Sequence, residues 1–427
     1  MTYAEAIQFL YGLQVFGMNP GLENTRKLAA ALGNPQQHLR FIHVAGTNGK
    51  GSTCAMLESI YRAAGLKVGL YTSPHLVSFR ERIQINRQLI PPADVVRLVS
   101  ELRPHVDALT AEHHPTVFET VTVLALKYFA EQQCDLVIWE TGLGGRLDAT
   151  NIVTPLASVI TNIGLDHTKW LGDTLAKIAA EKAGIIKPGV PVLTASHEPE
   201  ALAVIEAKSA ELKAPLTKIS AADQPPISLP LPGRHQQENA ALALAVLQVL
   251  QTVLPVKAQA IQEGFAQVSW PGRFQVIQRH GQTIVIDGAH NPDGAEVLAA
   301  TWRKQFPGVR PALVLGMMAD KDCEKVCSIL APLSDEIYTV PVASERRALP
   351  AELAWYCRQA NPAAQVEMWA SSNEPLMNSL RPLQSPGRFI LIAGSLYLVG
   401  EALSFLGLGE GDDERALNDW KSSPPTR

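Results

Sequence analysis

A glycine-rich run near the start of the chain, Gly46-Thr-Asn-Gly-Lys-Gly-Ser52, constrains the fold more than any other feature of the sequence. It follows an apolar segment, Phe41–Val44, that predicts a buried strand. After it, apolar residues recur at helical spacing up to Gly65, a residue typical of helix ends: Met56, Leu57, Ile60, Tyr61 and Ala64. A strand joined to a helix by so short a loop begins a βα unit, and such units build parallel sheets.

The same loop predicts a binding site for phosphate. The first N–H groups of a helix lack partners within the helix, and together with the helix dipole they attract an anion. Lys50 adds a positive charge suited to the β- and γ-phosphates of a nucleotide. The general P-loop pattern is not met, because Val44 stands where it requires a glycine and Gly51 separates the lysine from Ser52. A glycine-rich turn with a surface lysine is the structural alternative, but strand, loop, lysine, hydroxyl and helix coincide here, which favours phosphate binding.

Further strand candidates alternate with helical patterns in two series. The first series continues with Val68–Tyr71, Leu136–Trp139, Ala157–Thr161 and Val190–Leu193, and the second comprises Thr283–Ile286, Ala312–Leu315, Ile337–Val340 and Phe389–Ala393. We therefore expect an α/β protein in which a P-loop-type domain with a mostly parallel sheet, residues 1–270, precedes a smaller Rossmann-like α/β domain, residues 271–408. A Trp-Pro-Gly-Arg run marks the boundary, and the polar tail, residues 409–427, is expected to be disordered.

Composition excludes several classes of protein. The 427 residues are 46% hydrophobic and 18% charged with a net charge of −4, which indicates a globular protein and gives no reason to expect nucleic-acid binding. The five cysteines are scattered, unlike a disulfide framework, and Cys323 and Cys327 are expected in a core. The first residues lack the pattern of a signal peptide, and Ala240–Val256 predicts a buried helix rather than a membrane span. We expect a soluble, cytoplasmic protein.

Three polar residues stand at or just beyond the carboxyl ends of predicted strands, where ligands bind in parallel sheets. They are Ser73, Glu140 and His167. Magnesium prefers oxygen ligands and usually retains several waters, so Ser73 and Glu140 suit it, whereas a histidine is a less usual ligand. Two of them have a structural interpretation when taken alone: hydrogen bonding for His167, and helix capping or an ion pair for Glu140. As a set they predict a magnesium site.

Several longer motifs resemble those of a known family. His43-Val-Ala-Gly-Thr-Asn-Gly-Lys-Gly-Ser52 resembles the phosphate loop of the Mur ligase superfamily, whose variant explains why the general pattern fails. Other motifs resemble its folylpolyglutamate synthase/dihydrofolate synthase branch: Thr72-Ser-Pro-His-Leu76, Glu140-Thr-Gly-Leu-Gly-Gly-Arg-Leu-Asp-Ala-Thr-Asn151, Leu165-Asp-His-Thr168, Glu181-Lys-Ala-Gly-Ile185, Pro271-Gly-Arg-Phe274 and Asp287-Gly-Ala-His-Asn-Pro292. They occur in the family order, so the chain is identified as similar to that branch, and to its bifunctional bacterial type.

The resemblance implies an ATP-dependent ligase that joins L-glutamate to a pteroate or folate carboxylate through an acyl phosphate. ATP would be bound by Thr47, Asn48, Gly49, Lys50, Gly51, Ser52, Asn239, Arg273, Asp287 and His290. Two magnesium ions would be held by Ser73, Glu140 and His167. Lys182 would match a lysine that the family carries as N6-carboxylysine, a negatively charged carbamate. Lys50, Lys182 and His167 would form the catalytic group.

The resemblance also implies a site for the acceptor, the molecule that receives glutamate. The pteroate or folate would contact Asn19, Pro20, Arg82, Thr116, Val117, Phe118, Glu119, Leu147, Asp148 and Ala149. The segment Ser73–Arg82 would be a loop that closes over it. Closure of the second domain over the first would exclude water from the acyl phosphate. The substrates would be the partners, without nucleic acid or membrane, and the protein would be a monomer.

The sequence leaves alternatives open. The enzyme could extend dihydropteroate to dihydrofolate, lengthen the glutamate tail of tetrahydrofolates, or do both. It could be another Mur-type amide ligase acting on a peptidoglycan precursor, although those ligases have a dedicated domain before the phosphate loop, which here begins after 45 residues. It could also be a nucleotide-binding regulator without turnover, against which Lys50, Glu140, His167 and Lys182 argue together.

Overall fold

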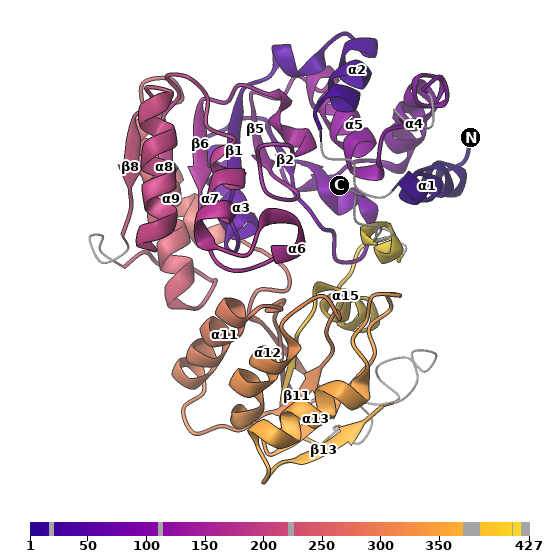
Figure 1. The fold of residues 1–427 in the computed structure, drawn as a ribbon, viewed down its shortest axis with the longest axis vertical. Helices are drawn as coiled ribbons and strands as arrows, with labels where there is room; N and C mark the ends of the chain where they lie inside the picture. Colours follow the sequence, from indigo (N-terminus) through magenta and orange to yellow (C-terminus); the bar gives the residue numbers. More distant parts are fainter. Residues whose placement is uncertain (17–20, 110–113, 221–225, 370–384, 412, 420–427) are drawn as a thin grey trace.

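The computed structural model describes residues 1–427 except 17–20, 110–113, 221–225, 370–384, 412 and 420–427. Its helices and strands form two bodies, drawn one above the other in Figure 1. Within the described residues, the upper body contains an eight-stranded sheet and the lower body a six-stranded one. The fold class predicted from the sequence is confirmed.

The upper sheet has the strand order β4-β3-β2-β5-β1-β6-β7-β8. Its strands are β1 (Phe41–Ala45), β2 (Val68–Tyr71), β3 (Ile83–Ile85), β4 (Gln88–Leu89), β5 (Leu136–Glu140), β6 (Ala157–Ile160), β7 (Val192–Thr194) and β8 (Leu216–Lys218). All neighbours run parallel except β2 with β3 and β3 with β4. The strand β1, which feeds the glycine-rich loop, therefore lies between β5 and β6, and the carboxyl ends of all three open onto the same edge.

Helices cover both faces of this sheet because its central strands are apolar on both sides. They are α1 (Tyr3–Gly12), α2 (Glu23–Ala31), α3 (Lys50–Ala63), α4 (Pro92–Asp107), α5 (Val117–Glu131), α6 (Thr168–Leu171), α7 (Leu175–Ala183), α8 (Pro199–Glu211), α9 (Arg234–Leu250) and α10 (Ala258–Gln267). One buried cluster joins α1, α2, α4 and α5 to one face, and a second joins α3, α9 and α10 to the other. The helix α3 thus starts at the strand-end edge with its body held in the core.

The lower sheet has the order β13-β12-β11-β14-β10-β9. Its strands are β9 (Gln275–Arg279), β10 (Gln282–Ile286), β11 (Ala312–Leu315), β12 (Glu336–Thr339), β13 (Gln365–Met368) and β14 (Phe389–Ala393), and only β9 pairs antiparallel. The helices α11 (Pro292–Gln305), α12 (Cys323–Leu330) and α13 (Pro350–Ala360) pack on one face and α15 (Leu396–Phe405) on the other. The domain division at residue 270 stays a prediction, which the packing of α10 on α3 supports.

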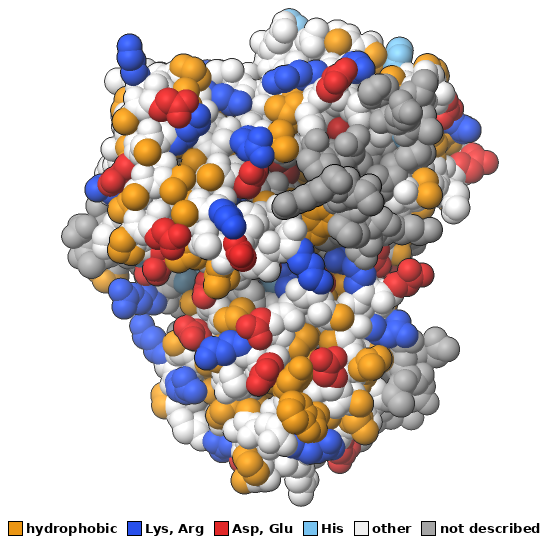
Figure 2. All heavy atoms as spheres, in the orientation of Figure 1, with side chains coloured by type: hydrophobic (Ala, Val, Ile, Leu, Met, Phe, Trp, Pro, Cys, Tyr) orange, Lys and Arg blue, Asp and Glu red, His pale blue; other side chains and the backbone are white. Residues whose placement is uncertain are grey.

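The two bodies meet along a seam that carries charge. On the face drawn in Figure 2, Lys and Arg side chains (blue) lie along the line where the upper and lower bodies meet. The chain crosses this seam after α10, and its last described segment returns to it. A polyanionic ligand is therefore best accommodated between the bodies.

Part of the tail is ordered, contrary to the sequence-based expectation. Residues 413–419 contain a short 3₁₀ helix, Arg415–Asn418, and the side chains of Glu414, Arg415, Leu417 and Asn418 are buried. The polar composition suggested disorder, but these polar groups find hydrogen-bond partners on both bodies, which local composition cannot reveal. Residues 412 and 420–427 of the predicted tail lie outside the described residues.

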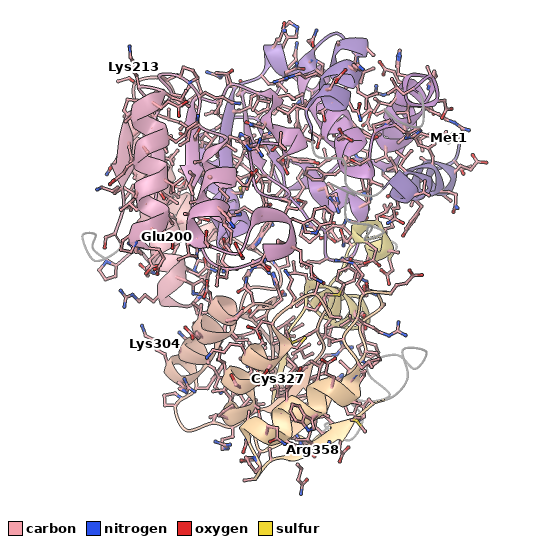
Figure 3. All side chains as sticks on the ribbon, viewed as in Figure 1. Met1, Glu200, Lys213, Lys304, Cys327 and Arg358 are labelled. Carbon is pink, nitrogen blue, oxygen red and sulfur yellow. The ribbon has the colours of Figure 1, made fainter. Side chains whose placement is uncertain are left out.

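Cys323 and Cys327 are core residues, as predicted, and the other cysteines of the chain are buried too. All five are buried and free, and Cys323 and Cys327 lie on α12 inside the lower body, where Figure 3 labels Cys327. No cluster of three or more His, Cys, Asp or Glu residues suited to a metal ion occurs among the described residues. Over the same part of the chain, every helix is too short or too polar to cross a membrane.

Candidate active site

A cavity of about 600 Å³ lies between the two bodies, bounded by the strand-end edge of the upper sheet. Nearly all residues predicted for the site line it: Thr47, Asn48, Gly49, Lys50, Gly51, Ser52, Ser73, Arg82, Thr116, Val117, Phe118, Glu119, Glu140, Leu147, Asp148, Ala149, His167, Lys182, Asn239, Arg273, Asp287 and His290. Asn19 and Pro20 lie outside the described residues. The structure thus brings the predicted residues together, while their individual roles stay predictions.

The glycine-rich loop is fixed by the segment that follows β6. The N–H of Thr47 donates to the Asn162 carbonyl at 2.8 Å, and the N–H of Asn48 donates to the Asn162 side chain at 2.7 Å. The hydroxyl of Thr161 donates to the Asn48 carbonyl at 2.6 Å. The loop then enters α3 at Lys50, whose ammonium donates to the loop carbonyls of Gly46 and Thr47. The first N–H groups of α3 and a lysine charge therefore face one pocket, as an anion site requires.

The helix α9 supports the loop from the side. The Gln236 amide donates to the Ser52 hydroxyl at 3.2 Å, and the Asn239 amide donates to Gln236 at 3.0 Å. Gly49 has φ +82°, and a Cβ added there would lie 2.4 Å from the Asn239 side-chain oxygen. Asn239, predicted from the resemblance to contact the nucleotide, is thus packed directly against the turn.

Gly49→Ala is expected to weaken nucleotide binding at least about tenfold, since both the left-handed turn and the contact with Asn239 must shift. Gly65→Ala is the matched control, because Gly65 has φ +89° and no heavy atom within 4 Å of an added Cβ. Both variants should lose roughly 1 kcal/mol of folding stability from the unfavourable backbone angle. Titration calorimetry with ADP and thermal melting would measure the two effects, and equal nucleotide affinities in both variants would contradict the account.

Glu140 and Ser73, two of the predicted magnesium ligands, lie next to each other in the wall of the cavity. Glu140 ends β5 and is 4% exposed, and its Oε2 accepts the Ser73 backbone N–H at 3.1 Å. Burial raises the pKa of the Glu140 carboxyl to about 7, although the charge of Lys50 acts in the opposite direction. A buried carboxylate bonded to the backbone of a serine, next to the predicted phosphate site, offers oxygen ligands of the kind that magnesium prefers.

His167 belongs to a polar cluster that joins the two bodies. Its neighbour Asp166 pairs with Lys321 of the lower body at 2.5 Å, and Lys321 lies 3.4 Å from His167 Nε2. Asn291 donates to Asp166 at 3.2 Å, and His290 Nε2 lies 3.6 Å from the same carboxylate. Burial opposes ionisation of Asp166, but the His290 hydrogen bond and nearby positive charge hold its pKa well below its usual range. Burial also lowers the pKa of His167 to about 4, which leaves a neutral imidazole able to bind a metal.

Lys182 is a buried lysine that lines the cavity. It lies on α7, is 4% exposed, and donates to the Gly46 carbonyl at 2.7 Å. Burial, with the charge of Lys50, lowers the pKa of the Lys182 ammonium to about 7. A large fraction of the amine is therefore neutral near neutral pH, the form that reacts with carbon dioxide.

Arg273 and Asp287 enter the cavity from the lower body. The Asp287 carboxylate accepts the backbone N–H groups of Phe274 and Ala289, both at 2.8 Å. These bonds tie the start of β9 to the end of β10 and hold Arg273 at the seam. Burial raises the pKa of both Asp287 and Glu140, and the charge of Arg273 opposes that rise in each, so it acts on groups of both bodies.

Glu119 and Asp148, two of the residues predicted to contact the pteroate or folate, make hydrogen bonds within the protein. Glu119 accepts the Thr116 N–H at 2.8 Å and caps α5, and Thr25 approaches it at 3.4 Å. Asp148 accepts hydrogen bonds from the backbone N–H groups of Gly142 and Leu143, and these bonds shape the glycine-rich loop that follows Glu140. Both acids therefore position the cavity wall. Direct contact with the acceptor stays a prediction.

Sequence reasoning missed several residues of the cavity. Asp320 and Lys321 follow the carboxyl end of β11, so the strand-end rule that found Glu140 would have found them had it been applied to the second sheet. Asn291 and Asp166 lie inside two of the motifs that resemble the family, but the resemblance implies no role for either. Leu417, Asn418 and Asp419 also line the cavity, and no local pattern pointed to them.

Comparison with known proteins agrees with this geometry. Residues 44–192 match the Mur ligase middle domain, and residues 272–396 match the Mur ligase glutamate ligase domain. The chain is 36% identical to the dihydrofolate synthase/folylpolyglutamate synthase of Bacillus subtilis, over 94% of this chain and 98% of that relative. Among solved structures it resembles the folylpolyglutamate synthase of Thermotoga maritima, with TM-score 0.83 and 34% identity over 97% of this chain and 98% of that one. It also resembles Escherichia coli FolC in complex with DHPP and ADP, with TM-score 0.82 and 33% identity over 95% and 98% of the two chains.

Proposed function

The chain belongs to the folylpolyglutamate synthase/dihydrofolate synthase family of Mur ligases, and from that premise we propose an ATP-dependent ligase that adds L-glutamate to a pteroate or folate carboxylate. Its acceptor is dihydropteroate, tetrahydrofolate polyglutamates, or both. The names of relatives with both activities favour the bifunctional enzyme. We further propose that it acts as a monomer in the cytoplasm.

One observation carries the proposal: a phosphate loop, a buried acid and cations from both bodies surround a single cavity. An acceptor carboxylate and ATP repel each other, so they react only where positive charge lies between them. Lys50 supplies such charge from the upper body and Arg273 from the lower body. Positioning and charge stabilisation of this kind account for most catalysis of phosphoryl transfer.

The residues fit the magnesium that the family uses. Glu140 offers a carboxylate, Ser73 a hydroxyl and the neutral imidazole of His167 a nitrogen, and all three residues line the cavity. We propose that two ions are held by these three residues, with the phosphates and water as further ligands. Bound there, magnesium would offset the negative charge of the phosphates during transfer.

The surroundings of Lys182 fit a carbamate. Burial lowers the pKa of its ammonium to about 7, so a substantial share of the amine is neutral near pH 7, and the Lys50 ammonium lies close enough to lower that pKa further. Without the carbamate, a charged Lys182 would be a second buried cation beside the Lys50 ammonium. A carbamate at Lys182 would instead be an anion beside that ammonium, and a nearby opposite charge favours the charged form of a buried group. We propose that Lys182 is N6-carboxylysine in the active enzyme.

The chemistry then proceeds in two steps. An oxygen of the acceptor carboxylate attacks the γ-phosphorus of ATP, forming an acyl phosphate and releasing ADP. The α-amine of glutamate attacks the acyl carbon, and the C–O bond to phosphate breaks, giving an amide and inorganic phosphate. The contacts of Asn48 with Asn291 and of Asp166 with Lys321 hold the two bodies together over this reaction. Such closure keeps water from the acyl phosphate.

The test is phosphate release by the purified protein with ATP, magnesium and L-glutamate. We expect release only when an acceptor is also present, and omission of glutamate should reduce it to the background. Comparing dihydropteroate with tetrahydrofolate assigns the activities: turnover with both establishes the bifunctional enzyme, and turnover with one assigns a single activity. ATP binding without stimulation by either acceptor would refute the proposed substrate class.

Magnesium binding is expected to depend on pH through Glu140. Because burial raises the pKa of this carboxyl to about 7, the metal-free site holds a proton below that pH. Magnesium must displace the proton, so the magnesium concentration for half-maximal turnover should rise by up to roughly tenfold for each pH unit below about 7 and change little above it. Measurements across this range at saturating ATP would test this, and a flat dependence would contradict the assignment of Glu140 as a ligand.

A further inference from the structure

The last described residues, 413–419, lie in the seam between the bodies and are called the C-terminal segment below. In Figure 1 the segment is the short yellow turn between α15 and the upper body. Leu417, Asn418 and Asp419 line the same cavity as the phosphate loop. This segment has no part in the ATP chemistry described above.

The C-terminal segment is bonded closely to Ser73–Arg82, called the acceptor loop here. Glu414 accepts from the Ser78 hydroxyl at 3.0 Å and from the Phe79 N–H at 2.7 Å, and its own N–H donates to the Val77 carbonyl at 2.9 Å. Asn418 donates to the His75 carbonyl at 2.9 Å. These bonds are buried, so water does not compete for them.

Arg82 is held by the same contacts. Its Nη2 donates to the Asn418 side-chain oxygen at 2.5 Å, and its Nε donates to His75 Nδ1 at 2.9 Å. Since Nδ1 accepts this bond, His75 Nε2 carries the proton and donates to the Glu414 carbonyl at 2.9 Å. Arg82 is 7% exposed and lines the cavity, and the hydrogen bonds to Asn418 and His75 set the direction of its guanidinium.

The segment is tied to the lower body and to α1 as well. Asp419 accepts from the Ser344 and Tyr397 hydroxyls, both at 2.8 Å, and Arg415 donates to the Tyr397 carbonyl at 3.0 Å. Gln14, just beyond α1, donates to the Ala416 carbonyl at 2.6 Å. Because the C-terminal segment is hydrogen-bonded to both bodies, it can hold the acceptor loop in one position.

Leu417 extends the apolar wall of the cavity. It is 4% exposed and belongs to the buried cluster of the upper body against which Val117 and Phe118 pack. Those two residues are among the predicted contacts of the acceptor. An apolar wall of this kind suits the flat rings of an aromatic ligand. A cation at the edge of the wall, here Arg82, can pair with the ligand's negative charge and so add to its affinity.

We propose that the C-terminal segment is part of the acceptor site: Glu414 and Asn418 hold the acceptor loop so that Arg82 faces the acceptor, and Leu417 forms part of the wall for its aromatic rings. The proposal rests on the proposed function for the identity of the acceptor. The positioning of the loop does not depend on it. Glu414 and Asn418 are positioning residues, since they act through Arg82 and His75.

The test is the double variant Glu414→Ala/Asn418→Ala in the full chain, with Ala416→Ser as the matched control because Ala416 is exposed and contributes only its backbone. The KM for the acceptor is expected to rise roughly 10- to 100-fold, the scale of one or two buried hydrogen bonds to a charged group, with the KM for ATP within about twofold. Leu417→Ala should also raise the acceptor KM. Hydrogen exchange of residues 74–82 should accelerate in the double variant and not in Leu417→Ala or the control.

The outcomes separate this proposal from the proposed function. An unchanged acceptor KM, or an equal rise in the KM for ATP, would show that the segment only joins the bodies and would overturn the inference. Exchange of residues 74–82 at the parent rate would overturn the positioning role, whatever the kinetics. If the parent protein itself shows no acceptor-stimulated turnover, the proposed function fails and the acceptor-binding part fails with it, while the exchange rates still decide whether the segment holds the loop.

Discussion

Lys182→Ala is expected to lower turnover by about three orders of magnitude, the scale of one lost electrostatic contact to a reacting group. The alanine cannot capture carbon dioxide, so the negative charge that we assign to position 182 is absent. Added formate or acetate should restore part of the activity by occupying the space left in the cavity. Initial rates with and without these short carboxylates would measure both effects.

The fold of this variant should persist. The pKa of Lys182 is lowered from 10.5 to about 7 on folding, so the unfolded chain binds more protons between these values, and stability at this position rises with pH across that window. Alanine removes the cost of burying an amine, and the melting temperature near pH 7 is expected to stay within about 4 °C of the parent. Lys177→Ala on the same helix is the control, because that side chain is 63% exposed and pairs with Asp173. Loss of the folded state, or unchanged turnover, would contradict the assignment.

Glu140→Gln is expected to abolish magnesium-dependent turnover, again by about three orders of magnitude. The amide keeps the shape of the side chain and can still accept the Ser73 N–H, but it carries no charge to bind a divalent cation. ATP turnover and binding of ADP, each measured over a magnesium titration, would separate a loss of metal affinity from a loss of nucleotide affinity.

Glu58→Gln provides the control for neutralising a buried acid. Glu58 lies on α3, is fully buried and pairs with Arg62 at 2.8 Å, outside the cavity. Burial raises its pKa as it does that of Glu140. Turnover should remain near the parent level in this variant. Equal losses in the two variants would mean that Glu140 supports the fold rather than a metal ion.

The parts of the site that the sequence predicted lie at or just after the ends of parallel strands. The phosphate loop follows β1 and enters α3 directly, so its place at the strand-end edge follows from local order alone. Glu140 and Ser73 end or follow strands that neighbour β1 or each other in the sheet, and the parallel order brings them to the same edge. Local pattern therefore sufficed for the phosphate pocket and its neighbouring acid.

Contacts between distant segments could not be predicted in this way. Lys321 meets Asp166 across 155 positions of sequence, and Asn418 meets Arg82 across 336. Nothing in the composition around either residue indicates its partner, because the partner is chosen by how the two bodies meet. The polar residues 413–419 looked like a disordered tail for the same reason: their buried hydrogen bonds exist only in the assembled protein.

The central claim is that this cavity activates an acceptor carboxylate by transferring phosphate to it. The most direct measurement uses an acceptor whose reactive carboxylate carries ¹⁸O at both oxygens, with ATP, magnesium and L-glutamate, followed by mass analysis of the products. We expect one labelled oxygen in each inorganic phosphate released, because the oxygen that attacks the γ-phosphorus leaves with the phosphate when the amide forms. Unlabelled phosphate alongside amide product would contradict the acyl phosphate and the account built on it.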